Sequence, residues 1–369
     1  MNFKESKPHL HFFYMENNID FWKKHIETKV KGKKTQEALI KYTENLISKK
    51  SIVIFDFNHL CKLLSVDNLS LSKVIYSTEH FYNNFEIPKR NGGVREICAP
   101  LPLLLNCQDW IYQNLLKPIP IHENCTGFRN GHSIKNNAEP HLHAEKILKL
   151  DLKDFFPSII KERVISVFIN LGYTPKLSYC LASICTLNNE LPQGAPTSPV
   201  LSNIIAKRLD YRLAGLSKKY DLKYTRYADD LTFSGTNLPV KLIEYITKII
   251  NNEGFTVNSK KTRLLDKGKR KIITGISVSS NKMTIPKKKK REIRQIIYYI
   301  DKYGIENHLN KKGMRDPIYL DRILGYLYFW NLVEKENTFL KDSIIKIKKQ
   351  IGLLNEKYKD FKEELIYQE

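Results

Sequence analysis

Three aspartates are the residues of this sequence best suited to catalysis. Asp151 follows a short apolar run at 147–150, and the pair Asp229 and Asp230 lies further along the chain. Phosphoryl transfer to a hydroxyl uses two divalent ions about 3.5–4 Å apart. Magnesium prefers oxygen ligands, so carboxylates suit this task. We therefore predict a site for two Mg²⁺ ions, with Mn²⁺ as a substitute, although an isolated Asp-Asp pair is also common in turns.

The elements around these acids indicate how they could meet. The runs at 222–227 and 231–234 predict a β-hairpin with Asp229 and Asp230 at its tip. The run at 147–150 predicts a strand that ends at Asp151. If these strands are neighbours in one sheet, the three carboxylates lie at the same edge.

Periodicity and turn residues predict the other elements. They are helices at 106–116, 159–171, 198–213 and 240–252, hairpins at 85–100 and 272–285, and a helical, lysine-rich end from 287. The hairpin at 85–100 turns at Asn91-Gly92-Gly93, residues that tolerate positive φ. Residues 1–80 predict helices and give no indication of function.

The chain is strongly basic. Lys and Arg number 61 against 39 Asp and Glu, which gives a formal net charge of +22 at pH 7. Hydrophobic residues make up 42%, well above the content of a disordered chain. A polyanionic partner is therefore expected, and nucleic acid fits best. We expect no membrane association, because the sequence has no apolar signal core and no apolar run of about 18 residues.

The cysteines indicate a reducing compartment. Six are scattered without any Cys-x-x-Cys pair or matching histidine cluster. We expect neither a zinc site nor a disulfide framework, and we place the protein in the cytoplasm.

Three segments together resemble the active-site blocks of reverse transcriptases, in the order found in that family. They are Asp151-Leu152-Lys153-Asp154-Phe155-Phe156, Leu191-Pro192-Gln193-Gly194-Ala195-Pro196-Thr197-Ser198-Pro199 and Tyr227-Ala228-Asp229-Asp230. The resemblance runs from about Phe85 to Thr284. It implies an α+β fold of the right-hand polymerase type, with fingers, a palm built on an antiparallel sheet with flanking helices, and a helical thumb.

The resemblance also implies domain limits. Residues 1–84 would be a helical region in the fingers, 85–148 the rest of the fingers, 149–284 the palm and 285–369 an RNA-binding thumb. Part of the fingers would come from 175–200.

The same resemblance assigns roles at the acids. It implies that Asp151 and Asp229 ligate the metal ions and that Asp230 is a second acid with a less direct role. A lysine suited to protonating the leaving group matches Lys261, with its neighbour Lys260 as the alternative.

Contacts to the incoming deoxynucleoside triphosphate are implied in the same way. Phe156 matches the bulky residue that blocks a ribose 2′-hydroxyl, with a plain core aromatic as the alternative. Gln193 and Gly194 match a loop against the nucleotide and template, where glycine permits close backbone approach. Lys89 and Arg95 match cations that neutralise the triphosphate, and Arg90 could replace Lys89 after a small register shift.

Two further segments resemble elements of bacterial retron reverse transcriptases. Asn137-Ala138-Glu139-Pro140-His141 is similar to their Asn-Ala-x-x-His element, and Ile273-Thr274-Gly275 to their Val-Thr-Gly element. We therefore assign RNA binding to Asn137, His141, Thr274 and Gly275. A buried or capping histidine is the structural alternative for His141.

The basic segment after 286 is the expected thumb surface for an RNA stem. Isoleucines at helical spacing, Ile293, Ile297 and Ile300 among them, predict an apolar face turned inward. The cations of this segment would face outward, interleaved with tyrosines. The predicted RNA contacts are Lys287, Lys288, Lys290, Arg291 and Arg294.

Retron resemblance implies a particular reaction and particular partners. A cognate structured noncoding RNA would be template and primer source, and synthesis from an internal guanosine 2′-hydroxyl would give branched RNA–DNA. A separate effector protein would complete an anti-phage defence system. The alternatives are an intron-encoded or diversity-generating reverse transcriptase, and a noncatalytic RNA-binding scaffold.

Overall fold

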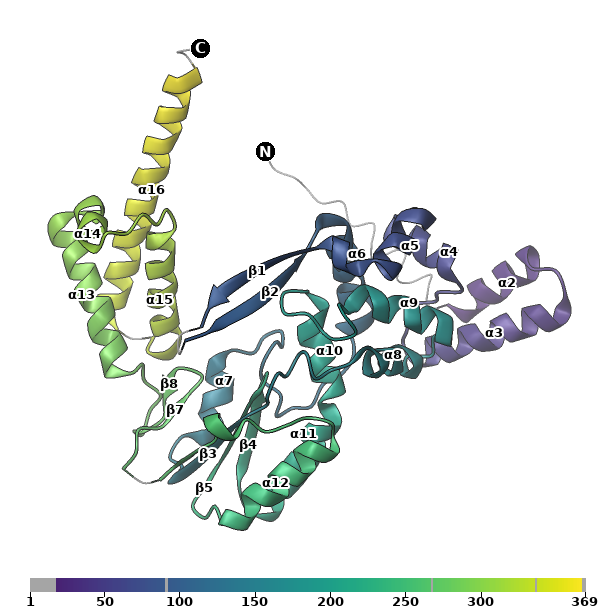
Figure 1. Cartoon of the computed structure of the whole chain (residues 1–369), viewed down its shortest axis with the longest axis horizontal. Helices are drawn as coiled ribbons and strands as arrows, with labels where there is room; N and C mark the ends of the chain where they lie inside the picture. The colour runs from purple at the N-terminus through teal and green to yellow at the C-terminus, as the bar shows by residue number, and fades with distance from the viewer. Residues whose placement is uncertain (1–17, 90–91, 267, 336, 367–369) are drawn as a thin grey trace.

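The structure is a computed structural model that describes residues 18–366 apart from 90–91, 267 and 336. Its N-terminal part is helical, as the sequence predicts for residues 18–80. Four helices and a 3-10 turn follow one another: α2 (Ile19–Lys29), α3 (Lys33–Ser48), α4 (Phe57–Leu64), α5 (Asn68–Tyr76) and η1 (Thr78–Phe81). Figure 1 shows α2 and α3 as a projecting pair at one end of the molecule.

A long two-stranded ribbon follows these helices. Strands β1 (Tyr82–Pro88) and β2 (Val94–Pro100) pair antiparallel, which confirms the predicted hairpin. The Lys89 amide donates to the Gly93 carbonyl at 2.9 Å and closes the turn. Asn91 of the predicted turn and the alternative cation Arg90 lie outside the described residues.

Helices at the base of the ribbon join it to the main core. They are α6 (Pro102–Ile111), the π-helical turn η2 (Tyr112–Leu116), α8 (Lys161–Asn170) and α9 (Pro175–Cys185). The helices predicted at 106–116 and 159–171 are confirmed within a few residues at each end. All six cysteines are buried and free.

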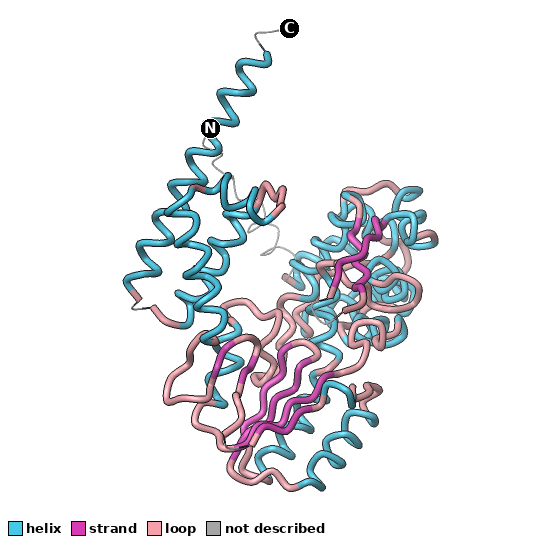
Figure 2. Tube along the Cα trace, turned by 60° about the vertical axis from the view of Figure 1, so that its left-hand side comes forward, coloured by secondary structure: helices cyan, strands magenta, loops and turns pink. Residues whose placement is uncertain are grey.

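The central sheet has four strands in the order β4-β5-β3-β6. They are β3 (Lys146–Asp151), β4 (Lys223–Tyr227), β5 (Asp230–Gly235) and β6 (Arg263–Leu265). All neighbours are antiparallel. Helices α11 (Lys207–Lys219) and α12 (Val240–Asn252) lie along one side of the sheet (Figures 1 and 2). The sequence therefore predicts the hairpin of β4 and β5, the strand before Asp151 and helix α12 correctly.

Two predicted elements differ in detail. The helix expected at 198–213 is divided at Ala206 into α10 (Thr197–Ile205) and α11. The hairpin expected at 272–285 has only the two-residue strands β7 (Ile272–Ile273) and β8 (Ile276–Ser277), extended by a bridge between Ser277 and Thr284. On the other side of the sheet from α11 and α12 lie α7 (Ile134–Ala138) and the short turn η3 (Glu139–His141).

The C-terminal helices form a separate group with its own core. They are α13 (Lys287–Tyr303), α14 (Ile305–Lys312), α15 (Tyr319–Val333) and α16 (Thr338–Ile366). Ile293, Ile297 and Ile300 are buried in that core, which confirms the predicted apolar face of α13. Within the described ranges, no helix has both the length and the apolar character needed to cross a membrane.

Candidate active site

The sheet brings the three aspartates together. Asp151, the last residue of β3, pairs with Asp230, the first residue of β5. Asp229 precedes Asp230 in the turn between β4 and β5, and its carbonyl accepts a 2.9 Å hydrogen bond from the Leu152 amide. The three acids therefore lie at one edge of one sheet, as the strand pattern predicts.

Crowding of the carboxylates changes their acidity. The pKa of Asp229 is raised to about 6, by burial first and then by the charges of Asp230 and Asp151. Burial also raises the pKa of Asp230, with Asp151 adding to the effect and Lys149 opposing it. A cation placed between buried carboxylates that repel one another stabilises their charged form. This donor set fits hard divalent ions such as Mg²⁺.

A lysine forms an ion pair with one of the three carboxylates. The Lys261 ammonium donates to both oxygens of Asp151, at 2.8 and 3.0 Å. The hydrogen bond to Asp151 is the main cause of a raised Lys261 pKa. Both Lys261 and the neighbouring Lys260 are exposed, so the contact with Asp151 is what distinguishes Lys261. Of the two lysines considered, Lys261 is therefore the one that lies in the site.

The acids do not form a ready-made metal cage. In the part of the chain that the structure describes, no group of three or more His, Cys, Asp and Glu side chains is arranged to hold a metal ion. The Lys261 ammonium balances the charge of Asp151 in this arrangement.

The β1–β2 ribbon and the 191–194 loop bring the predicted nucleotide contacts together. Lys89, Arg95 and Gln193 line one pocket of about 170 Å³. Glu96 and Glu190 line it as well, so the pocket is not uniformly basic. Burial, followed by the charge of Glu96, raises the pKa of Glu190. The predicted cations thus have acidic neighbours that the sequence pattern did not single out.

Gly194 is required by close backbone contact. Its φ is +129°, and a Cβ at this position would lie 2.5 Å from the Cys98 carbonyl oxygen in β2. Beside it, the Cys98 amide donates to the Gln193 carbonyl at 2.7 Å. The loop is therefore fastened to the ribbon, and the close approach seen at Gly194 is to β2, while its contact with a nucleotide stays a prediction.

Phe156 lies in a group of aromatic rings. Its ring centroid is 5.7 Å from that of Phe155 and 6.1 Å from that of Phe128. Phe128 also contacts Tyr227, at 6.2 Å. Phe155 is buried in the main core. Sequence reasoning missed Phe128, whose φ of +55° places it in a tight loop.

The two elements with retron resemblance meet inside the protein. The side-chain amide of Asn137 donates to the Thr274 hydroxyl at 3.4 Å, and its Oδ1 accepts from the Thr126 hydroxyl at 2.9 Å. His141 contacts Ser234 at 2.6 Å and Thr225 at 2.8 Å. Asn137 and His141 are both 0% exposed. These two side chains therefore offer no surface to RNA, which corrects the assignment above.

The turn between β7 and β8 connects this region to the C-terminal helices. Thr274 and Gly275 both have positive φ, at 44° and 86°. A Cβ on Gly275 would lie 3.6 Å from the ring of Phe329 in α15. Ala138, Ile273 and Phe329 belong to one small apolar cluster. The Ile-Thr-Gly element thus packs between α7 and α15.

The cations of α13 divide into two groups. Lys287, Lys288, Arg291 and Arg294 are exposed, as a nucleic-acid surface requires. Arg294 lies over the ring of Trp330 at 5.4 Å. Lys290 instead pairs with Glu334 at 2.7 Å, so its charge is already balanced within the protein. The prediction that Lys290 contacts RNA is thus the weakest of the five.

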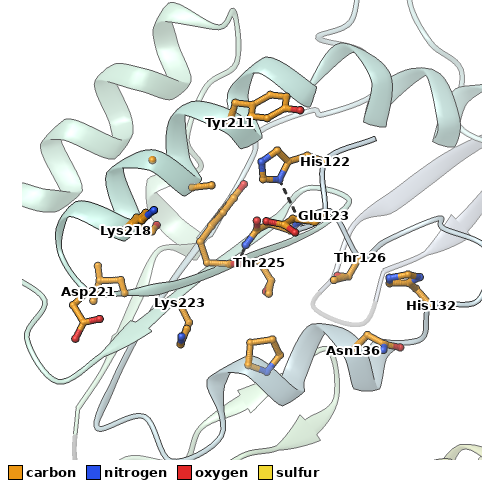
Figure 3. Close-up of a pocket in the computed structure, with 17 residues that line it drawn as sticks. His122, Glu123, Thr126, His132, Asn136, Tyr211, Lys218, Asp221, Lys223 and Thr225 are labelled. Atoms are coloured by element: carbon orange, nitrogen blue, oxygen red, sulfur yellow. Dashed lines mark hydrogen bonds between the residues drawn. The ribbon is translucent and has the colours of Figure 1, made fainter. Parts of the chain in front are cut away.

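A second cavity lies on another side of the sheet. It has a volume of about 710 Å³ and is lined by α11, β4 and the 122–126 segment. Figure 3 shows the Tyr211 and His122 side chains on one wall and Lys223 and His132 on others. The predicted site residues do not line this cavity.

Comparison with known proteins places the chain. The profile of the family described as reverse transcriptase (RNA-dependent DNA polymerase) matches residues 87–301. The chain therefore belongs to the reverse transcriptases, and the expected α+β polymerase fold is confirmed. Enzymes of this family use divalent metal ions.

Its relatives narrow the family further. The retron Ec86 reverse transcriptase of Escherichia coli is 39% identical over 241 residues, which cover 64% of this chain and 75% of that protein. The retron Mx65 reverse transcriptase of Myxococcus xanthus is 37% identical over 276 residues, or 69% of this chain and 62% of that one. Within the family, this chain is a retron reverse transcriptase.

A solved structure of telomerase from Candida albicans with a fragment of telomeric RNA also aligns. Its TM-score is 0.41 at 15% identity, over 73% of this chain and 57% of that one.

Proposed function

We propose that this enzyme copies a cognate structured noncoding RNA into DNA, starting from an internal guanosine 2′-hydroxyl and giving a branched RNA–DNA product. One observation carries the proposal: a chain 39% identical to a retron reverse transcriptase brings three aspartates to one edge of its sheet. The strongly positive charge of the chain supports a nucleic-acid partner.

In this proposal Asp151, Asp229 and Asp230 hold two Mg²⁺ ions, for which Mn²⁺ can substitute. When bound, the ions would activate the attacking hydroxyl and stabilise the leaving pyrophosphate. Lys261 would then exchange its contact with Asp151 for one with the substrate and donate a proton to the leaving group. Lysine is protonated at neutral pH, as that role requires.

The nucleotide contacts follow from the pocket beside the ribbon. Lys89 and Arg95 would neutralise the triphosphate of a deoxynucleotide, and Gln193 would lie against the nucleotide from the loop. Gly194 would bring the loop backbone close to the substrate. Phe156 would exclude nucleotides with a 2′-hydroxyl.

The partners follow from the retron relatives. We propose that the RNA and its DNA product stay bound to the enzyme through the exposed cations of α13, with Tyr298 beside them, 54% exposed. A separate effector protein would act with this complex in an anti-phage defence system in the cytoplasm.

Purification from cells that carry the whole locus tests the proposed reaction. We expect the wild-type protein to yield a short DNA that is joined to RNA at one guanosine. Nuclease treatment should leave this bond intact. Asp229→Asn should abolish this DNA, because the carboxylate is lost without a change of size. Asp109→Asn, at an exposed aspartate of α6, is the matched control and should retain it.

Two outcomes would contradict the proposal. Wild-type protein without DNA would rule out reverse transcription of a cognate RNA. Equal amounts of DNA from the wild-type protein and Asp229→Asn would rule out the assignment of the catalytic acids.

A further inference from the structure

The turn that carries Asp229 is conformationally demanding. Ala228, between Tyr227 and Asp229, has a φ of +55°, in the left-handed region that favours glycine. Ala228 is also buried. An alanine held in this conformation needs support from the structure around it.

A buried arginine supplies one part of that support. Arg226 in β4 is 0% exposed, and its guanidinium donates to the Ala228 carbonyl at 3.2 Å. The same guanidinium contacts both carboxylate oxygens of Asp210 in α11, at 2.8 and 2.6 Å. Asp210 is itself 0% exposed. The ion pair therefore joins the turn to the helix beneath the sheet.

Further hydrogen bonds complete this buried network. Asn203 in α10 accepts from the Arg226 guanidinium at 3.1 Å, and the Tyr224 hydroxyl donates to Asp210 at 2.8 Å. The two charges are thus held by partners from α10, α11, β4 and the turn itself. Such a network has one well-defined geometry.

A glycine also packs closely against this turn. A Cβ on Gly127 would lie 2.7 Å from the Ala228 amide nitrogen and 3.2 Å from Tyr227. The Gly127 carbonyl accepts from the Asn203 side chain at 2.9 Å. The backbone of residue 127 therefore lies against the peptide whose carbonyl Arg226 holds, and Asn203 contacts both supports.

We propose that Arg226, Asp210 and Gly127 are positioning residues that set the metal affinity of the catalytic turn. A buried ion pair contributes little to stability compared with apolar residues of similar size, so stability alone does not explain this pair. Its particular geometry aims one guanidinium nitrogen at the carbonyl before Asp229. Groups behind a metal ligand that fix its orientation affect metal affinity and rate by about 10- to 100-fold. The inference rests on the metal site proposed above.

Two variants test the proposal by different routes. The triple substitution Arg226→Met, Asp210→Leu and Tyr224→Phe replaces the network by apolar groups and leaves no buried charge behind. Gly127→Ala keeps every charge and adds one methyl group against Ala228. Gly215→Ala is its matched control, because a Cβ there has no neighbour within 4 Å.

The first measurement is independent of catalysis. It is the affinity of the purified protein for Mn²⁺, determined from the electron paramagnetic resonance signal of the free ion. We expect both variants to weaken Mn²⁺ binding by about 10-fold or more. DNA synthesis on a poly(rA)–oligo(dT) substrate should show a lower kcat, an increased Mg²⁺ requirement and little change in the KM for dTTP. Gly215→Ala should match the wild-type protein in each measurement.

Wild-type metal affinity and kcat in folded Gly127→Ala would overturn the proposal, whether or not the triple variant folds. A rise in the KM for dTTP alone would also overturn it, because it would locate the effect at the nucleotide pocket. If the wild-type protein itself binds no Mn²⁺, the proposed metal site is what fails. Neither assay uses the cognate RNA, so an error in the RNA assignment does not affect the result.

Discussion

At the scale of single residues, the aromatic group around Phe156 is the feature with the most direct consequence for selectivity. Phe156 is partly buried and packs against Phe155 and Phe128, so its ring has few positions open to it. A side chain fixed in this way can reject a substrate by a steric clash rather than by a lost contact. In the proposed role of Phe156, selectivity for the sugar would depend on this ring.

Phe156→Ala should therefore admit ribonucleotides. We expect the ratio of kcat/KM for deoxynucleotides over ribonucleotides to fall by about 10- to 200-fold, the range for one apolar contact in a pocket. Single-nucleotide incorporation with dCTP and CTP measures the ratio. Phe21→Ala, at an exposed phenylalanine of α2, is the control and should keep wild-type discrimination. An unchanged ratio in Phe156→Ala would refute the assignment.

At the scale of elements, His141 in the turn η3 forms hydrogen bonds to the hairpin of β4 and β5. Its two ring nitrogens contact Thr225 on β4 and Ser234 on β5. Burial lowers the His141 pKa to about 3. The residue is thus a neutral hydrogen-bonding link between neighbouring strands, and protonation would place an uncompensated charge in the core.

This link predicts a pH dependence of stability. The pKa of His141 in the folded protein lies below its ordinary value of about 6.5. At a pH between the two pKa values, the unfolded chain therefore binds a proton at His141 that the folded protein does not. The contribution of His141 is complete above about pH 6.5 and is lost as the pH falls. It changes the free energy of unfolding by up to about 1.4 kcal/mol per pH unit.

Urea unfolding between pH 7.5 and 5 measures this effect. His141→Gln, which keeps hydrogen-bonding groups but cannot be protonated, should show a shallower loss of stability with acid than the wild-type protein. His132→Gln, at an exposed histidine, should retain the wild-type slope. Parallel wild-type and His141→Gln curves would mean that His141 does not titrate between folded and unfolded states.

At the scale of the whole molecule, the C-terminal helices and the rest of the chain have separate cores. The β7–β8 turn and its apolar cluster form a contact between them. The exposed cations Lys287 and Lys288 begin α13 close to this contact. RNA held by α13 would therefore be fixed relative to the palm sheet through a small apolar junction.

Binding of the cognate RNA should weaken steeply with salt, because lysine and arginine contacts release counterions. Replacing Lys287 and Lys288 by alanine should reduce the slope of log K against log salt by about 1.4 to 1.8. Filter binding from 50 to 300 mM KCl, roughly the range in which such slopes are measured, gives this number.

A second double variant separates a specific contact from general charge. Lys33 and Lys34 are exposed on α3, far from α13 in Figure 1, and their replacement by alanine removes the same charge. This variant should retain the wild-type slope. Equal reductions in both variants would mean that net charge, rather than α13, determines the salt dependence.

Local patterns in the sequence predicted the elements that carry the acids. The strand ending at Asp151 and the hairpin around Asp229 follow from alternating apolar residues and turn residues, which act over a few positions along the chain. Helix α12 and the apolar face of α13 follow from helical periodicity. The three segments that resemble the active-site blocks of reverse transcriptases then indicated which side chains belong to one site.

Tertiary structure alone decided which distant residues meet. Asn137 and Thr274 contact each other inside the protein, and their sequence elements gave no sign of burial. Arg226 finds Asp210, and Gly127 finds Ala228, only because α11 packs on β4 and the 124–127 segment pairs with the same strand. Such contacts depend on the packing of the whole core, which short-range periodicity does not encode. The sequence therefore predicted that these three acids share a site, and the fold showed that they lie together and what surrounds them.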